Sequence, residues 1–154
     1  MTEQIQLYCK SLSELGIENS VLEHPVARNI SDVLSSLKLS FSDCSPTLIM
    51  KADGNFLAVI IRGDTKADFK KIKKLLSIKD LRMANPDEVT SLTKLALGTA
   101  RVYNPGVKTI IDRKIFEKDF LAGGSGAFDC SIRIRTVDLN KLPNSETVDI
   151  SKTE

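Results

Sequence analysis

The chain has 154 residues, of which 42% are hydrophobic and 27% charged, and its formal net charge is +2. This length and balance predict one globular domain with a sizeable core and exclude a disordered chain. No run of 18 apolar residues is present, and the start Met1-Thr-Glu-Gln4 lacks the basic and then apolar order of a secretory signal. We therefore expect a cytoplasmic protein that does not enter a membrane.

The few cysteines and histidines limit the chemistry available to the chain. Cys9, Cys44 and Cys130 are odd in number and widely spaced, which argues against a disulfide framework and against a zinc knuckle. With His24 as the single histidine, a multi-histidine metal site is excluded. A Ser-His-Asp or Cys-His system would have to be built around that one ring. We expect no metal and no cofactor.

The first elements in chain order are a helix, a strand and a second helix. Apolar residues recur at helical spacing over residues 4–15, and Gly16 follows at the position of a C-terminal cap. Residues 17–23 predict a short strand that stops before His24-Pro25, because the residue before a proline prefers an extended conformation. Ser31 is expected to cap the next helix.

A predicted β-hairpin over residues 46–63 is the central feature of the chain. Its two apolar runs flank Asp53-Gly54-Asn55, a turn sequence that tolerates positive φ. The second run, residues 56–61, lacks alternating polar residues, so we expect a central strand covered on both faces. Lys51 lies in phase with Ile49 on the first strand, and an ammonium in an apolar sheet needs an anion or water. Its partner is either an anionic ligand or the solvent around an edge strand.

Positive charge is concentrated after the hairpin. From Arg62 to Arg82 we count 8 basic residues against 3 acidic ones. Asp64 or Thr65 is expected to cap a helix here, with its apolar stripe facing inward and its lysines outward. Such a face either attracts a polyanion or is simply solvated. The outward lysines are Lys66, Lys70, Lys73 and Lys74.

The C-terminal half alternates between short elements and glycine-bearing loops. Asn85-Pro-Asp-Glu88 is a strong helix start, with asparagine as the cap and proline at the first position. Later elements are strands over residues 107–111 and 130–134, a partly extended stretch over residues 116–122, and a short helix over residues 136–142. After Pro143 the composition is polar. We therefore expect one domain over residues 1–142 and a mobile tail over residues 143–154.

Two glycine-bearing loops, at Gly98 and at residues 123–126, can bring backbone N–H groups close to a ligand oxygen. Neither is a nucleotide-binding fingerprint. The first lacks the Lys-Ser/Thr of a P-loop, and the second precedes a strand instead of opening a helix. Ordinary turns are the alternative interpretation of both loops.

Six segments together carry a resemblance to a known family. They are residues 21–25 (VLEHP), residues 48–54 (LIMKADG), Gly63-Asp64 with the lysine-rich helix, residues 81–88 (LRMANPDE), Gly98, and residues 122–129 (AGGSGAFD). In this order they resemble the YbaK/prolyl-tRNA synthetase-associated editing domain, over about residues 12–142. The resemblance implies a mixed α/β fold in which a curved, barrel-like mixed sheet is surrounded by helices.

The activity that the resemblance implies is trans-editing by a freestanding aminoacyl-tRNA deacylase. Such an enzyme hydrolyses the ester of a mischarged tRNA that carries a small amino acid such as alanine, serine, threonine or cysteine. A positioned water attacks the ester with help from a substrate hydroxyl, so no protein nucleophile is needed. The implied partners are aminoacyl-tRNA and an aminoacyl-tRNA synthetase. The alternatives are a non-catalytic adaptor that binds tRNA or a synthetase, and a nucleotide-binding regulator.

The resemblance also implies roles for individual residues. Lys51 would hold the phosphate near the terminal adenosine, Gly98 would orient the aminoacyl group, and Asp129 would help to close the pocket as a third catalytic residue or pair with Arg133. The implied substrate-binding residues are His24, Thr99, Gly123, Gly124 and Ser125, and the implied tRNA-binding residues are Lys66, Lys70, Lys73 and Lys74. For His24 a cap or core role stays open.

One family motif, Gly-x-x-x-Pro, reads Gly98-Thr-Ala-Arg-Val102 in this chain. The proline is absent, and so is a histidine that some family members have near the position of Phe128. Since the proline-bearing loop sizes the pocket in the family, the amino-acid specificity does not carry over to this chain.

Overall fold

The computed structural model describes residues 2–95 and 98–153. The helices are α1 (Glu3–Glu14), α2 (Ile30–Leu37), α3 (Phe69–Leu76) and α4 (Pro86–Thr93), with 3-10 segments η1 (Phe41–Asp43), η2 (Arg113–Glu117) and η3 (Thr136–Lys141). The strands are β1 (Asn19–Glu23), β2 (Thr47–Ala52), β3 (Asn55–Ile60), β4 (Lys66–Ala67), β5 (Leu81–Met83), β6 (Lys108–Asp112), β7 (Phe120–Gly124), β8 (Cys130–Arg135), β9 (Ser145–Val148) and β10 (Ser151–Lys152). Within this described part of the chain, every helix is too short or too polar to cross a membrane.

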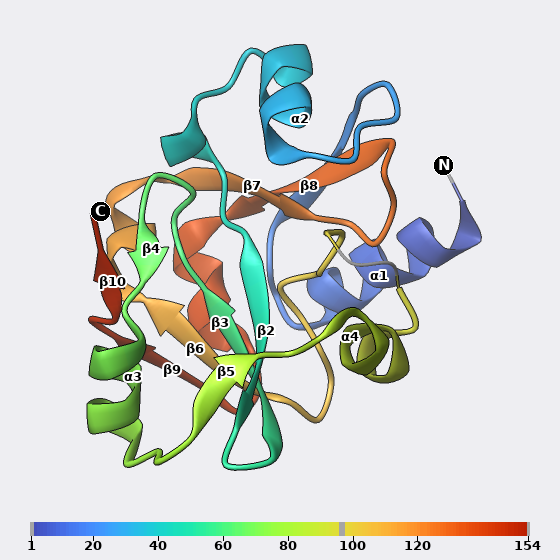
Figure 1. The fold of residues 1–154 in the computed structure, drawn as a ribbon. Helices are drawn as coiled ribbons and strands as arrows, with labels where there is room; N and C mark the ends of the chain where they lie inside the picture. Colours follow the sequence, from blue (N-terminus) through green and yellow to red (C-terminus); the bar gives the residue numbers. More distant parts are fainter. Residues whose placement is uncertain (1, 96–97, 154) are drawn as a thin grey trace.

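The strands form a mixed five-stranded sheet and an antiparallel three-stranded sheet (Figure 1). The larger sheet has the order β5-β2-β3-β6-β9, in which β2 pairs antiparallel with β5 and β3, and β6 pairs parallel with β3 and β9. The smaller sheet has the order β1-β8-β7, and β4 pairs with β10. The predicted mixed α/β fold, with a mixed sheet and surrounding helices, is confirmed.

The β2–β3 hairpin has the geometry that its sequence predicts. Lys51 lies opposite Phe56, and the connecting residues Asp53 and Gly54 have φ values of 48° and 86°. Two successive positive φ values are those of a type I′ turn, whose twist matches that of the flanking strands. Strand β3 lies between β2 and β6, and its residues 57–60 are buried. The expected central strand is therefore confirmed.

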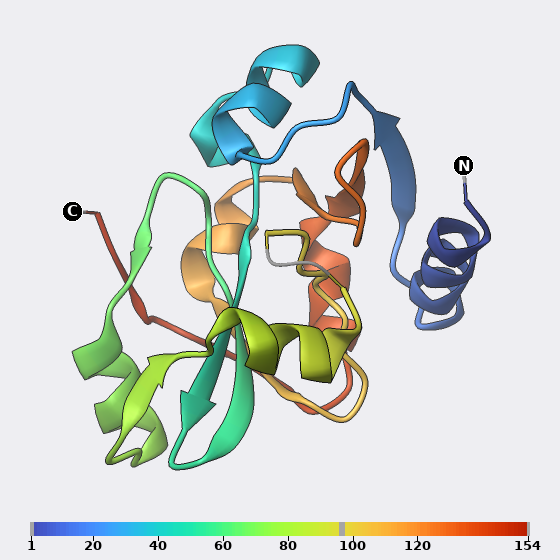
Figure 2. The same ribbon diagram turned by 45° about the vertical axis from the view of Figure 1, so that its right-hand side comes forward.

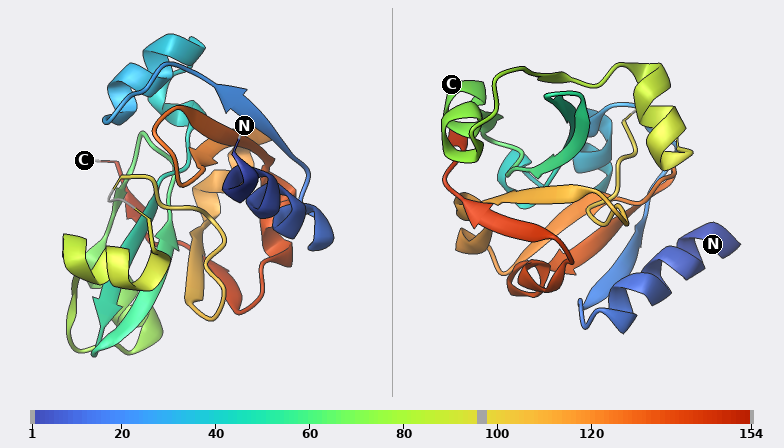
Figure 3. Two further views of the ribbon diagram at one scale, coloured as in Figure 1. Left: turned by 90° about the vertical axis from the view of Figure 1, so that its right-hand side faces the viewer. Right: turned by 90° about the horizontal axis from the view of Figure 1, so that it is seen from below.

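Helices cover the larger sheet on both faces. Ile72 of α3 packs with Met50 on one face, whereas Val89 of α4 packs with Ile49 on the other. Since successive side chains of a strand point to opposite faces, α3 and α4 lie on opposite sides of β2. Helix α1 packs against the smaller sheet through Tyr8 and other apolar residues. Figure 3 shows α1 and α3 on opposite sides of the molecule.

The N-terminal cap of α4 is the residue that the sequence predicts, whereas the caps of α2 and α3 differ from the predicted residues. Asn85 caps α4 by accepting the Glu88 N–H at 2.8 Å, as predicted. The cap of α2 is Asn29, not Ser31, and the cap of α3 is Asp68, not Asp64 or Thr65. Helix α3 begins late because residues 66–67 are extended and pair with β10. Lys66 therefore lies on a strand and not on the helix.

The segment after Pro143 differs from the predicted mobile tail. Residues 145–148 pair with β6, and residues 151–152 pair with β4. Between them Ile150 is fully buried, and its N–H donates to the buried carboxylate of Asp112 at 3.0 Å. The expectation of a tail outside the domain is corrected, because the apolar side chains of Val148 and Ile150 and the pairings with β6 and β4 attach this polar segment to the core.

Candidate functional site

A cavity of about 480 Å³ lies between α2, β2, α4 and the first residues of β8. In Figure 2, α2 and α4 lie at two ends of this region, and the loop that begins at Gly98 runs between them. The walls of the cavity are mostly small or apolar side chains, among them Leu34, Ile49 and Val89. This volume is within the range of pockets that hold small organic ligands.

Five of the predicted site residues line the cavity: His24, Gly98, Thr99, Gly123 and Gly124. The lining also contains two thiols, Cys44 and Cys130, and the guanidinium of Arg28, but no carboxylate among the residues that the structure describes. Over the same described residues, no group of three or more histidine, cysteine, aspartate and glutamate side chains is placed to hold a metal ion. The site is therefore an apolar chamber with little charge.

His24 is held at the cavity wall by both of its ring nitrogens. Nδ1 lies 2.9 Å from the Pro25 carbonyl oxygen, and Nε2 lies 3.1 Å from Ser131 Oγ. Because a carbonyl can only accept, Nδ1 carries the proton in the neutral ring and Nε2 accepts from the serine hydroxyl. Since His24 is only 9% exposed, this pairing gives the ring a structural role in the wall.

Glycines let two backbones meet at another wall. Gly124 forms a β-bridge with Arg101, and a Cβ at Gly124 would collide with the carbonyl of Ala100. A Cβ at Gly123 would instead make ordinary contacts, 3.4 Å from Val102 and 3.5 Å from Ser45. Gly98 has a φ of +92°, which L side chains rarely adopt. These positions expose backbone, and not side chains, to the cavity.

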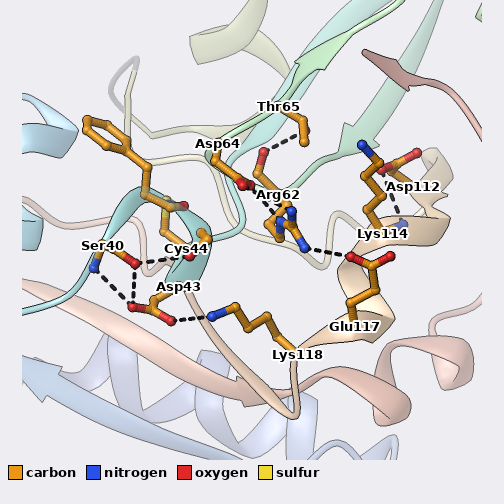
Figure 4. A network of polar contacts seen from close by, with 12 residues as sticks. Ser40, Asp43, Cys44, Arg62, Asp64, Thr65, Asp112, Lys114, Glu117 and Lys118 are labelled. Carbon is orange, nitrogen blue, oxygen red and sulfur yellow. Dashed lines mark hydrogen bonds and ion pairs between the residues drawn. The ribbon is translucent and has the colours of Figure 1, made fainter. Parts of the chain in front are cut away.

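A network of charges supports the wall that Cys44 forms (Figure 4). Asp43 accepts hydrogen bonds from the Ser40 backbone and side chain and pairs with Lys118 at 3.1 Å, and these contacts lower its pKa to about 2. Nearby, Arg62 bridges Asp64 and Glu117. Burial raises the pKa of the Cys44 thiol to about 11, so this thiol is neutral at physiological pH.

The mouth of the cavity is apolar with one cation. Ile30, Phe41 and Met83 line the cavity and are 40%, 45% and 45% exposed. Beside them Arg28 lies 4.4 Å from the centroid of the Phe128 ring. Apolar faces next to a guanidinium suit a flat base and a nearby anion. Sequence reasoning missed these residues, because they come from separate elements that share no motif.

Three of the predicted catalytic and substrate-binding residues do not line the cavity. The ammonium of Lys51 lies 4.2 Å from the centroid of the Phe56 ring. Ser125 is fully buried, and its hydroxyl donates to the Cys130 carbonyl at 2.6 Å. The Asp129 side chain is exposed, and its backbone carbonyl accepts the His24 N–H at 3.1 Å. Ser125 and Asp129 thus shape the loop that follows β7.

The larger sheet separates the predicted tRNA-binding lysines of α3 from the cavity. Lys70, Lys73 and Lys74 belong to α3, which covers the face of β2 opposite the one that lines the cavity with Ile49 (Figure 1). Lys66 precedes them on β4. The structure does not bring these lysines to the mouth, where the basic side chain is Arg28.

Comparisons with known proteins point to one family. Residues 24–142 match the family profile described as the aminoacyl-tRNA editing domain. Among curated proteins, the proline–tRNA ligase of Caldicellulosiruptor bescii is 28% identical over 127 residues, which are 82% of this chain and 22% of the ligase. The proline–tRNA ligase of Solidesulfovibrio magneticus is 31% identical over 122 residues, which are 78% of this chain and 21% of that ligase. The chain thus spans about a fifth of the length of these curated relatives.

Two solved structures share the fold over almost their whole length. One is a hypothetical protein, APE2540, with a TM-score of 0.86 and 23% identity, covering 97% of this chain and 100% of its own. The other is described as a candidate trans-editing enzyme for prolyl-tRNA synthetase, with a TM-score of 0.85, 17% identity and 99% coverage of both chains. At these identities the likeness shows the fold.

Proposed function

This chain belongs to the aminoacyl-tRNA editing domain family, and on that premise we propose that it hydrolyses the ester of a mischarged tRNA in trans. The cargo is a small amino acid such as alanine, serine, threonine or cysteine. The observation that carries the proposal is the cavity of about 480 Å³, whose lining includes the backbone of Gly98 and Gly123. A chamber of this kind can enclose an aminoacyl group and exclude bulk water from its ester.

In the proposed reaction a bound water attacks the ester carbonyl carbon, and the ribose oxygen leaves with a proton. The ester is already activated, so positioning and backbone N–H donors are sufficient. Ionised carboxylates in the lining would repel the developing oxyanion. The cavity wall, as described, has none, which supports this mechanism.

Lys51 would hold a phosphate of the tRNA 3′ end just outside the cavity. It lies on β2 two residues from Ile49, which lines the cavity, and on the same strand face. Arg82 faces it on β5, but this guanidinium is paired with Glu88 at 2.8 Å. Lys51 is therefore the better phosphate contact of the two, and Arg28 would provide a second positive charge at the mouth.

The test is deacylation of tRNAs carrying alanine, serine, threonine or cysteine by the wild type and by Lys51→Ala. We expect one cargo to be turned over, and a loss of tenfold or more in the variant. Absence of turnover across the panel with intact tRNA binding would support the non-catalytic adaptor instead. Micromolar binding of free adenine nucleotides, without a response to aminoacyl-tRNA, would support the nucleotide-binding regulator.

The α3 lysines would contact the tRNA body away from the cavity. Replacing Lys70, Lys73 and Lys74 with alanine should weaken tRNA binding and flatten its dependence on salt, since each phosphate that is no longer neutralised lowers the salt slope by about 0.7 to 0.9. The exposed Lys10, on α1, serves as a control lysine on another helix. An unchanged salt slope in the triple variant would remove α3 from the interface.

A further inference from the structure

Helix α1 lies outside the residues that match the family, yet it contacts the loop that forms one wall of the cavity. Its Tyr8 is 4% exposed, and the phenolic oxygen accepts the Val102 N–H at 3.1 Å. The guanidinium of Arg101 lies 4.4 Å from the centroid of the same ring. One side chain of α1 therefore holds two consecutive loop residues.

Arg101 extends this contact to the second glycine loop. Its Nε donates to the Ser125 carbonyl at 2.8 Å, and its backbone forms a bridge with Gly124. The Gly126 N–H also donates to the Thr99 carbonyl at 3.0 Å. The two loops are thus linked to each other and, through Tyr8, to α1.

The hydrogen bond to Tyr8 matters because Val102 is fully buried. Without the phenolic oxygen, this N–H would be a buried donor with no partner, and the loop would have to move to satisfy it. Gly98, Thr99 and Ala100, which immediately precede this anchored pair, line the cavity. Any movement of the anchor therefore displaces the cavity wall.

We propose that Tyr8 is a positioning residue that sets the place of the loop over residues 98–102 and thereby the selectivity of the cavity among small aminoacyl groups. The inference rests on the proposed function of the cavity. Discrimination between cargoes that differ by one methyl or hydroxyl group depends on close fit at the wall. A loop anchored by α1 keeps that fit, and a loosened loop loses it.

The first variant is Tyr8→Phe, which removes the phenolic oxygen and keeps the ring under Arg101. Amide-linked alanyl-, seryl- and threonyl-adenosine, which cannot be hydrolysed, are the binding probes. We expect the ratio between the tightest and the weakest affinity to fall threefold or more. Leu7→Ala, at a position of α1 that is 56% exposed, is the control and should keep the wild-type ratio.

The second variant separates positioning from general loss of stability. Proline has no N–H, so Val102→Pro removes the buried donor that the Tyr8 oxygen satisfies. Arg101, the residue before it, forms a β-bridge with Gly124. This pairing is compatible with the extended conformation that a residue before proline prefers. The double variant Tyr8→Phe/Val102→Pro should therefore recover at least half of the lost affinity ratio. A double variant no more selective than Tyr8→Phe alone would overturn the proposal.

Hydrogen exchange provides a readout that does not depend on turnover. In Tyr8→Phe the Val102 amide should exchange at least tenfold faster than in the wild type. If Tyr8→Phe keeps both the wild-type exchange rate of the Val102 amide and the wild-type affinity ratio, the proposal is overturned. Absence of deacylation by the wild type would instead contradict the proposed function, and the affinity ratio and the exchange rate would still decide the role of Tyr8.

Discussion

His24 Nε2 and Ser131 Oγ lie 3.1 Å apart at the cavity wall and join the end of β1 to β8. The second ring nitrogen is taken by the Pro25 carbonyl. Both polar atoms of the imidazole are thus used within the protein. The structure supports a role for His24 in holding the cavity wall. A contact between the face of its ring and a substrate is compatible with this role.

Ser131→Ala should therefore destabilise the protein. It leaves His24 Nε2 as an unpaired, buried acceptor, which costs about 1–3 kcal/mol. The free energy of unfolding, measured in urea, should fall by this amount, whereas Ser20→Ala at an exposed position of β1 should change it little. Equal stabilities of the two variants would show that the pair does not hold the wall.

Neighbouring glycines of β7 should respond differently to the same substitution. Gly124→Ala places a methyl group against the Ala100 carbonyl, so the two backbones must separate, and we expect a loss of about 1–3 kcal/mol. Gly123→Ala meets Val102 and Ser45 at ordinary distances and should cost less than about 1 kcal/mol. Thermal melts of the two variants would check this order, and the reverse order would contradict the described loop contact.

The Asp43 carboxylate should make the free energy of unfolding depend on pH in the acidic range. Its folded pKa, about 2, is below the unfolded value of about 3.9. The stabilisation is therefore complete above about pH 5 and disappears as pH falls toward 2. The difference in unfolding free energy between the wild type and Asp43→Asn should shrink over this interval. A difference that stays constant down to about pH 2.5 would contradict the lowering of this pKa by the Ser40 hydrogen bonds and the Lys118 ion pair.

The C-terminal segment should be needed for stability. Ile150→Ala removes a fully buried side chain and should cost about 2–5 kcal/mol. Lys152→Ala, at an exposed position two residues later, should have little effect. Removal of residues 143–154 should destabilise the protein at least as much as Ile150→Ala. A truncated chain that melts like the wild type would restore the interpretation of this segment as a tail.

Elements with local signals could be predicted from the sequence. Asp53-Gly54 specifies its turn through two adjacent positive φ values, and Asn85 caps α4 through a contact three residues away. The start of α2 is less predictable, since Asn29 and Ser31 are both good caps and lie two residues apart. The local sequence therefore permits either residue as the cap, and the fold of the surrounding chain determines which one is used.

The candidate site depends on contacts that no local pattern encodes. The mouth combines Arg28, Phe41 and Met83 from distant parts of the chain. Lys51 has the predicted phase with Ile49, but the cavity ends before it reaches the ammonium. Ile150 and Val148 are the two aliphatic residues of an otherwise polar stretch, and their packing against the core accompanies the parallel pairing of β9 with β6.

The most direct test of the central claim asks whether the ester is hydrolysed inside the cavity. Ala84 lines the cavity and is 8% exposed, so Ala84→Leu should partly fill it. The measurement is the single-turnover deacylation rate of the preferred cargo, with thermal melts and tRNA binding as controls. We predict a loss of tenfold or more in a folded variant that still binds tRNA. A wild-type rate in that variant would place the reaction elsewhere.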